Sequence, residues 1–335
     1  MANRNLAAAK RAKNDEFYTR LQDVEKELIH YRPQFVGKIV FLNCDDPTHS
    51  AFWRHFHLLF SVYGLKKLIA THYESDGSAS YAMVYEGGSD NDVLTGRRVE
   101  LVSNGDFRSD ECVEFLKESD IVVTNPPFSL FREYVAQLME YDKQFLIIGN
   151  MNAVTYKEIF PLIQSDRMWL GVTRQGTGQM WFMVSDDFPV KTGQKIEDGV
   201  RYQTIGNSAW FTNLDVKQRH EELFLSATYY KNDGSVPQLS LERWPHYDNY
   251  DAIEVGKVKD IPVDYAGVMG VPITFLGKYN PKQFEIIGLD RYTVPKKDLV
   301  GGRVAVNGKP CYARILIRAR HPHPAGVPVV FDEYE

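Results

Sequence analysis

The first half of the chain alternates short apolar runs with stretches in which apolar residues recur every three or four positions. Short apolar runs are typical of buried strands, and the longer spacing is typical of helices that bury one face. The predicted strands cover residues 38–43, 67–71, 99–103, 121–124 and 145–148, and the predicted helices cover 52–63, 110–119, 131–138 and 156–164. This alternation predicts an α/β fold with a doubly wound parallel sheet.

The pattern changes twice along the chain. Residues 77–98 are polar and rich in glycine, which predicts a hairpin or a loop. From residue 168 onward the apolar runs lie close together and predict an antiparallel element at the end of the sheet. Beyond residue 213 the helical alternation is lost and prolines and aromatic residues become frequent, which favours an irregular α+β module. We therefore divide the chain into 1–210, with a basic arm at 1–13, and 211–335.

The composition is that of a soluble globular protein, with 44% hydrophobic and 25% charged residues among 335. The start of the chain does not look like a secretory signal, and no apolar run approaches the roughly 18 residues that a membrane span needs. Cys44, Cys112 and Cys311 lie too far apart for a disulfide framework or a zinc knuckle. We expect a cytoplasmic protein with no membrane partner and no metal site.

The net charge of −5 is unevenly distributed. Residues 278–320 contain ten basic and three acidic side chains, and the arm before Asn14 contains four basic ones. Basic ends on an acidic body fit phosphate binding by dedicated segments, although a solvated charged face explains the charge equally well. Lys296 and Lys297 are the candidates for phosphate contacts.

Asn125-Pro126-Pro127-Phe128 directly follows a predicted buried strand, where open α/β sheets bind their ligands. The Asn125 side-chain oxygen and the Pro126 carbonyl can accept the two hydrogens of an aromatic amine, in a backbone that Pro127 helps to fix. Phe128 can stack on the ring that carries the amine. A simple strand-ending turn is the alternative explanation of the two prolines.

This tetrapeptide resembles the catalytic Asp/Asn/Ser-Pro-Pro-Tyr/Phe motif of amino-methyltransferases. Together with residues 14–19 and 43–47, it makes the chain similar to the EcoRI methylase-like family of adenine-specific DNA methyltransferases. The resemblance implies a Rossmann-like class I sheet that binds S-adenosyl-L-methionine, followed by a C-terminal target-recognition module. It also implies transfer of a methyl group to N6 of an adenine that has been flipped out of double-stranded DNA.

The resemblance places the methyl donor near four sets of residues. Phe17, Tyr18 and Thr19 match an element that packs on the cofactor, although Arg20 stands where the family usually has proline. The turn after the first strand contains no glycine, and either Asp45 or Asp46 would accept from the methionine amino group. After the second strand, Glu74 or Asp76 would accept from the ribose. The full set of expected donor-binding residues is Phe17, Tyr18, Thr19, Asn43, Cys44, Asp45, Asp46, Glu74, Asp106 and Phe107.

The partners also follow from the resemblance. Arg174 or Gln175, in the glycine-rich stretch 171–178, would contact DNA near the target base, although a hairpin turn explains that stretch equally well. The protein would be a monomer from a bacterium or phage, acting in DNA protection or beside a restriction endonuclease specific for the same site. The sequence does not name the bases recognised.

Three alternatives remain at this point. The same motif suits methylation of adenine in RNA or of glutamine in a protein. The chain could also be a catalytically idle DNA-binding relative, or a subunit that needs a partner for activity. The intact motif at Asn125 argues against an idle protein, and the basic C-terminal stretch argues against a protein substrate.

Overall fold

The computed structural model describes residues 18–74, 76–88, 95–173, 180–184, 192–204, 207–325 and 327. The chain forms two compact units. The first unit contains residues 1–153 and 168–216, and the second contains residues 154–167 and 217–335. The division is therefore not contiguous along the chain, unlike the division at residue 210 expected from the sequence.

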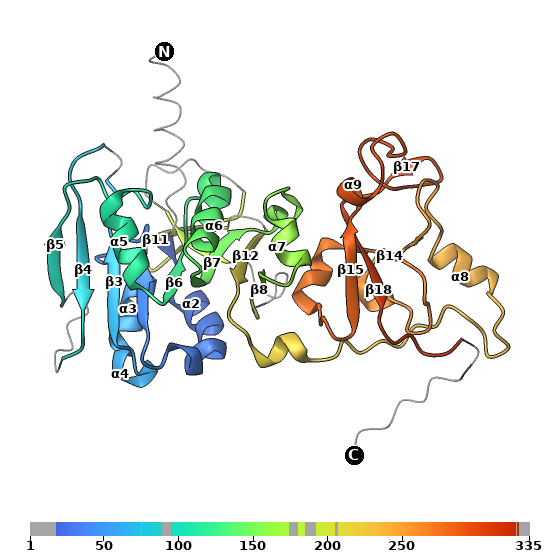
Figure 1. Cartoon of the computed structure of the whole chain (residues 1–335), viewed down its shortest axis with the longest axis horizontal. Helices are drawn as coiled ribbons and strands as arrows, with labels where there is room; N and C mark the ends of the chain where they lie inside the picture. The colour runs from blue at the N-terminus through green and yellow to red at the C-terminus, as the bar shows by residue number, and fades with distance from the viewer. Residues whose placement is uncertain are drawn as a thin grey trace, which may run out of the picture. The chain divides into compact units, whose positions relative to one another are not determined.

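The first unit is built on an eight-stranded sheet (Figure 1). Its strand order is β5 (Arg97–Glu100), β4 (Tyr81–Tyr85), β3 (Lys67–Thr71), β2 (Ile39–Leu42), β6 (Ile121–Thr124), β7 (Gln144–Asn150), β12 (Ser208–Thr212) and β8 (Trp169–Leu170). The four central strands, β3, β2, β6 and β7, are parallel, and antiparallel strands extend the sheet at both edges. The chain leaves β2 for β3 on one side and later returns to β6 on the other, so the order reverses next to β2.

Helices cover both faces of this sheet because its strands are apolar on both sides. Alternate strand residues such as Val40 and Leu42 share a core with α2 (Leu21–Leu28), the 3-10 helix η1 (Ile29–Phe35), α3 (Ala51–Leu58) and α4 (Phe60–Tyr63). On the opposite face, Phe41 contacts Phe115 of α5 (Asp110–Glu118). Phe131 of α6 (Phe131–Glu140) contacts Phe211 on that face.

The region 77–103 differs in part from the sequence-based prediction. Residues 81–85 form a largely buried strand, β4, that runs antiparallel to β3. The strand predicted at 99–103 begins earlier, as β5, and pairs antiparallel with β4 at the exposed edge. The prediction of a third parallel strand is therefore wrong. A short hairpin returns the chain beside β3 without the long crossover that a parallel strand would need.

A second, antiparallel sheet belongs to the same unit. Its order is β1 (Tyr18–Thr19), β9 (Trp181–Met183), β11 (Val200–Thr204) and β10 (Gln194–Glu197). One face is buried, because Thr19, Phe182 and Gln203 are each at most 5% exposed. Arg20 follows β1 directly and is the N-cap residue of α2, so this small sheet is joined to the helix without a loop.

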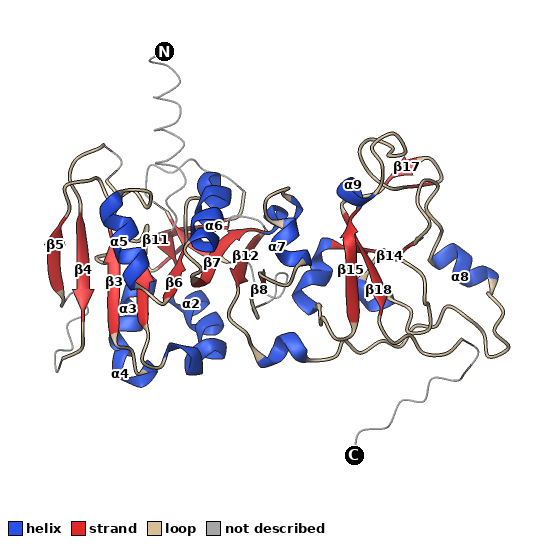
Figure 2. Cartoon of the chain, viewed as in Figure 1, coloured by secondary structure: helices blue, strands red, loops and turns tan. Residues whose placement is uncertain are grey.

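The second unit is an α+β structure around a four-stranded sheet (Figure 2). The order is β13 (Ile253–Glu254), β14 (Met269–Pro272), β18 (Arg314–Ala319) and β15 (Phe284–Leu289), and a separate hairpin pairs β16 (Ala305–Val306) with β17 (Lys309–Pro310). Its helices are α7 (Phe160–Gln164), α8 (Gln238–Arg243) and α9 (Asp290–Thr293). The chain also contains short 3-10 helices in both units. They are η2 (Phe128–Leu130) in the first unit, η3 (Met151–Thr155) where the chain leaves it, and η4 (Lys217–His220), η5 (Val258–Asp260) and η6 (Ile273–Lys278) in the second.

Segment 154–167 belongs with the second unit through specific contacts. Gln164 Nε2 donates a hydrogen bond of 2.9 Å to the carbonyl of Ile287, and the Tyr292 hydroxyl donates one of 2.9 Å to the carbonyl of Thr155. Phe160 and Ile163 on α7 are buried. In the part of the chain that the structure describes, we find no helix long and apolar enough to cross a membrane.

Candidate functional site

A pocket lies at the carboxyl ends of the central strands of the first unit. Its empty volume is about 940 Å³, including the open solvent at its mouth. Of the residues expected from the sequence to bind ligand, it is lined by Tyr18, Thr19, Cys44, Asp45, Asp46, Asp106, Phe107, Asn125 and Pro127. Because the strand order reverses next to β2, this is the position where doubly wound sheets bind ligands.

Several pocket residues were not singled out in the sequence. They are Phe52, His72, Tyr73, Gly105, Arg108, Ser129 and Leu130. His72 and Tyr73 directly follow strand β3, so the rule that led to Asn125, a polar turn after a buried strand, could have found them. Phe52 looked like an ordinary core residue because it belongs to the apolar stripe of α3.

Other expected residues lie outside the pocket lining. Asn43, Glu74 and Pro126 stand beside it, and Phe128 is half-buried against the hydrophobic core. Phe17 and Arg174 lie outside the described residues, as do Gln175 and the arm 1–13. Lys296 and Lys297 are exposed on the second unit.

Asn43 joins the ends of three strands. Its side-chain oxygen accepts hydrogen bonds from Thr71 Oγ1 at 2.8 Å and from the Cys44 backbone N–H at 2.9 Å. Its carbonyl accepts a hydrogen bond from the Thr124 hydroxyl. Thr71 ends β3 and Thr124 ends β6, so Asn43 fixes the turns that follow β2 and β6 relative to each other. Asn43 does not itself line the cavity, so its role in the site is to fix the turns that do.

Cys44 makes the sharp turn that follows β2. Its φ is 62°, in the left-handed region that residues with a side chain rarely adopt. This conformation brings the chain around so that both Cys44 and Asp45 face the cavity. Burial raises the pKa of the Cys44 thiol well above its usual value, so the group is a neutral packing residue at physiological pH.

Asp45 is a buried carboxyl group with one side-chain partner among the described residues. It accepts a hydrogen bond from the Ser50 hydroxyl, and Asp45 as a whole is only 8% exposed. Burial, reinforced by the charge of Asp46, raises the pKa of Asp45 to about 7, although the bond from Ser50 opposes the shift. A cation or an additional donor in the pocket would therefore stabilise its ionised form.

Asp46 is already saturated with donors. Its carboxylate accepts hydrogen bonds from the Thr48 backbone N–H at 2.9 Å, the Thr48 hydroxyl at 2.8 Å and the Tyr81 hydroxyl at 2.9 Å. His49 Nδ1 lies 3.1 Å from its second oxygen. Burial pushes the pKa of Asp46 upward, but these hydrogen bonds outweigh it and the pKa is lowered. Asp46 therefore shapes the turn before α3.

Glu74 is engaged by a neighbour. His72 Nε2 lies 3.0 Å from the Glu74 carboxylate, and the His72 ring packs on Tyr81 with 5.4 Å between ring centroids. The backbone N–H of Glu74 donates a hydrogen bond of 2.8 Å to the carbonyl of Asn104, which joins the turns after β3 and β5. His72, rather than Glu74, reaches the cavity.

Gly105 and Asp106, which follow β5 in the chain, form another wall of the pocket. Gly105 has a φ of +78°, and a Cβ at this position would overlap the carbonyl oxygen of His72, so no other residue fits. The Asp106 carboxylate is paired with Arg108, which donates bonds of 2.9 Å from Nε and 2.7 Å from Nη2. These bonds hold the pKa of Asp106 below its usual value. The guanidinium lies 5.2 Å from the centroid of the Phe107 ring.

The turn after β6 projects Asn125 and Pro127 into the cavity. The Asn125 side-chain oxygen is buried. The turn closes when the Leu130 N–H donates a hydrogen bond of 2.9 Å to the Pro127 carbonyl, which starts η2 and then α6. Leu130 and Pro127 give this wall an apolar surface beside the Asn125 amide.

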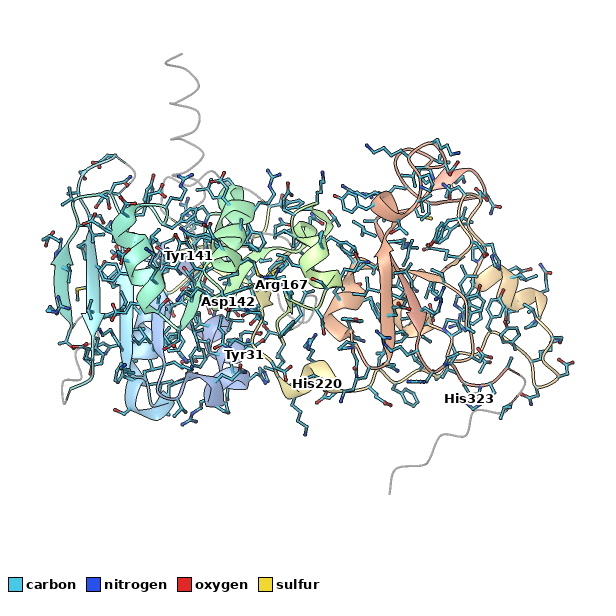
Figure 3. The ribbon with its side chains drawn as sticks, in the orientation of Figure 1. Tyr31, Tyr141, Asp142, Arg167, His220 and His323 are labelled. Atoms are coloured by element: carbon cyan, nitrogen blue, oxygen red, sulfur yellow. The ribbon has the colours of Figure 1, made fainter. Side chains whose placement is uncertain are left out.

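Two carboxylates on helix α2, which follows β1, bind the backbone of residues 172–173 and of Trp181 at the start of β9, the strand that pairs with β1. Glu27 is fully buried, and its two oxygens accept bonds of 2.7 Å from the N–H groups of Val172 and Thr173 and a bond of 2.7 Å from the Tyr31 hydroxyl (Tyr31 is labelled in Figure 3). One turn earlier, Asp23 accepts a 3.3 Å bond from the Trp181 N–H. Helix α2 thus grips the chain on both sides of residues 174–179.

Thr19 on β1 presents a buried hydroxyl to the pocket. Its oxygen has no hydrogen-bond partner among the described residues, and Thr19 lines the cavity. Buried polar groups usually have a partner, so this hydroxyl is suited to a ligand group. A search of the described residues finds no cluster of three or more histidine, cysteine or acidic side chains that could hold a metal ion.

Comparisons with known proteins cover nearly the whole chain. The model of a family described as "Adenine-specific methyltransferase EcoRI" matches residues 5–320. The type II methyltransferase M.EcoRI of Escherichia coli is 47% identical over 94% of this chain and 96% of its own length. M.MpnI of Mycoplasma pneumoniae is 38% identical over 93% and 97%, and M.MgeORF184P of Mycoplasma genitalium is 38% identical over 92% and 97%. No solved structure matches the chain.

Proposed function

The chain belongs to the EcoRI family of adenine-specific methyltransferases, and from this premise we propose that it methylates N6 of adenine in double-stranded DNA, with S-adenosyl-L-methionine as donor. The observation that carries the proposal is the single pocket that brings Asn125 and Pro127 together with Cys44, Asp45 and Asp106. Catalytic and donor-binding positions far apart in sequence line one cavity, as direct transfer between two bound ligands requires.

The pocket residues fit the donor. Among the described residues, the Asp45 carboxyl group has one side-chain donor, Ser50, whereas Asp46 already accepts several hydrogen bonds. Asp45 is therefore the better candidate to accept from the methionine ammonium group. The Thr19 hydroxyl offers a second polar contact. Phe107 offers an aromatic ring that lines the pocket, and the neighbouring Asp106 carboxylate is paired with Arg108. When bound, the donor supplies a methyl group activated by its positively charged sulfur.

Asn125 and Pro126 position the acceptor amine. An aromatic amine is a poor nucleophile because its lone pair is delocalised into the ring. The Asn125 side-chain oxygen and the Pro126 carbonyl would accept its two hydrogens and favour the tetrahedral geometry needed for attack. Pro127 and Leu130 provide apolar surface for the flipped base. Phe128 packs against the core, so stacking on the base would require its ring to leave that contact.

The two units divide the work. We assign methyl transfer to the first unit, as a Rossmann-like class I methyltransferase sheet with an antiparallel β4–β5 hairpin, and target recognition to the second. The excess of basic residues at 278–320 supports phosphate binding by the second unit, with Lys296 and Lys297 among the contacts. We propose that the protein acts as a monomer, and that a restriction endonuclease specific for the same site is its cellular counterpart.

The test is methylation by the purified full-length chain with radiolabelled S-adenosyl-L-methionine and three acceptors: duplex DNA, an RNA of the same sequence and a glutamine-containing peptide. We expect transfer to duplex DNA alone. Modified-base sequencing of that DNA should locate N6-methyladenine at one short recurring site. Transfer to RNA or peptide instead would refute the DNA assignment, and donor binding without transfer to any acceptor would favour an idle relative.

A further inference from the structure

The small antiparallel sheet of the first unit has one buried face and one face that carries aromatic side chains. On the buried face, Phe182 and Gln203 are cross-strand partners. Side chains alternate along a strand, so Trp181 and Tyr202, each one residue away, project from the other face. Both are partly exposed.

Two cations lie over these rings. Lys195 on β10 is directly opposite Tyr202, and its ammonium nitrogen is 4.7 Å from the Trp181 ring centroid and 5.7 Å from that of Tyr202. The guanidinium of Arg20 is 5.3 Å from the Tyr202 ring centroid. The Glu197 carboxylate contacts both cations, at 2.6 Å from Lys195 and 3.7 Å from Arg20. We call Trp181, Tyr202, Lys195 and Arg20 the cationic aromatic face.

This face is continuous with the pocket. Tyr18 on β1 pairs with Met183, which in turn pairs with Tyr202, so all three project from the same side of the sheet. Tyr18 also lines the pocket that contains Asn125. A chain leaving the pocket past Tyr18 would therefore meet Tyr202 and then the two cations.

We infer that the cationic aromatic face binds the DNA strand that carries the target adenine, next to the extruded nucleotide. The inference rests on the proposed function. Flipping a base leaves its neighbours partly unstacked and their phosphates close to the protein. Trp181 and Tyr202 can stack on an unstacked base or sugar, and Arg20 and Lys195 can neutralise the adjoining phosphates.

The test measures DNA binding of the full-length protein by fluorescence anisotropy, with a synthetic duplex carrying the site that sequencing identifies and a second duplex lacking it. Tyr202→Ala should weaken binding to the site duplex by about five- to a hundredfold, and affect the second duplex less, because extrusion occurs only at the site. Tyr202→Phe should retain most of the affinity. Lys195→Ala should weaken binding to both duplexes and reduce the salt slope by about 1.

Ile196→Ala is the matched control. Ile196 is 71% exposed on the same strand, one residue from Lys195, and projects from the opposite side of the sheet. It should bind both duplexes as the unaltered protein does. Thermal unfolding and donor affinity of each variant separate a lost DNA contact from a damaged fold, since Tyr202→Ala should change neither.

The two proposals fail in different ways. If the unaltered protein methylates duplex DNA while Tyr202→Ala and Lys195→Ala bind the site duplex unchanged, this inference is refuted and the proposed function stands. If the unaltered protein does not methylate duplex DNA, the proposed function is refuted first. Equal losses for Tyr202→Ala and Ile196→Ala would also refute a specific role for this face.

Discussion

Asp45 and Asp46 are adjacent in the sequence, yet their carboxyl groups have opposite pKa shifts in the fold. Asp45 is buried with one hydrogen-bond donor from Ser50, and its pKa is raised to about 7. Asp46 accepts from Thr48, His49 and Tyr81, and its pKa is lowered. The fold therefore leaves one carboxyl group of the pair in need of a partner.

The stability of the ligand-free protein should reflect the raised pKa of Asp45. Between the usual value of 3.8 and about 7, the folded state keeps a proton that the unfolded state releases, so stability should fall as pH rises through this range. Asp45→Asn should flatten that fall. Thermal unfolding at about pH 5 and about pH 8 measures the difference. Asp46→Asn should lower stability at both values and make the fall somewhat smaller, because the charge of Asp46 contributes to the raised pKa of Asp45. An Asp45→Asn variant whose stability falls with pH as steeply as that of the unaltered protein would contradict the raised pKa.

Donor affinity should follow the same group. If Asp45 must ionise to accept from the ammonium group, affinity for S-adenosyl-L-methionine should decrease by up to about tenfold per pH unit below about pH 7. Isothermal titration calorimetry in buffers of different ionisation enthalpy should detect proton release on binding near pH 6. Binding that is independent of pH would assign the ammonium contact to another residue.

Asn125→Ala should abolish transfer but spare donor binding. Removing one positioned acceptor should reduce the rate constant of methyl transfer on the order of a hundredfold or more. Single-turnover methylation measures this rate, and calorimetry measures donor affinity. Asn125→Asp is the informative companion, because the motif of amino-methyltransferases permits Asp and its oxygen can still accept. A fully active Asn125→Ala variant would remove this residue from catalysis.

Glu27→Gln should destabilise the first unit. A glutamine keeps the shape of the side chain but presents an NH₂ group to N–H donors such as those of Val172 and Thr173. Leaving such donors unsatisfied should cost about 2–3 kcal/mol of unfolding free energy. Urea unfolding measures the loss. Glu25→Gln, on the exposed side of the same helix, should change stability little. Equal losses for the two substitutions would show that the buried hydrogen bonds of Glu27 do not contribute specifically to stability.

Lys296→Ala combined with Lys297→Ala should weaken DNA binding regardless of sequence. If both side chains contact phosphates, the slope of log affinity against log salt should become shallower by about 2. Lys257→Ala combined with Lys259→Ala supplies a control pair, also exposed on the second unit but outside residues 278–320. Identical salt slopes for the two pairs would exclude Lys296 and Lys297 from the interface.

Local patterns in the sequence predicted much of the site. A buried strand followed by a polar turn led to Asn125, and the family resemblance led to Cys44 and Asp45 in the turn after β2. The structure brings all three into one pocket because parallel strands end at the same edge of a sheet. The family resemblance added Tyr18 and Asp106. These predictions depend on residues that are neighbours along the chain or on motifs copied as a block.

Contacts between distant segments could not be predicted in this way. Glu27 bonds to residues about 145 positions away, and nothing near it in the sequence distinguishes it from a surface glutamate of an amphipathic helix. The prediction of a hairpin or a loop at residues 77–98 is confirmed as a hairpin by the antiparallel pairing of β4 with β5. The bounds of β4 (Tyr81–Tyr85) were not predicted, because this strand lies within a polar, glycine-rich stretch. Its strand character comes from pairing with β3, a tertiary contact that outweighs the local composition.

The chain passes between the two units three times, after residues 153, 167 and 216. After a single proteolytic cut at one of these crossings, the other two crossings would still link the two units covalently. A truncation after residue 216 would remove β15, against which α7 packs, and would expose the side chains of Phe160 and Ile163. If the second unit recognises the target, as proposed, exchange of target specificity between relatives would need both of its pieces, 154–167 and 217–335, to be inherited together. On that assignment, recombination at one breakpoint would transfer only part of the recognition unit.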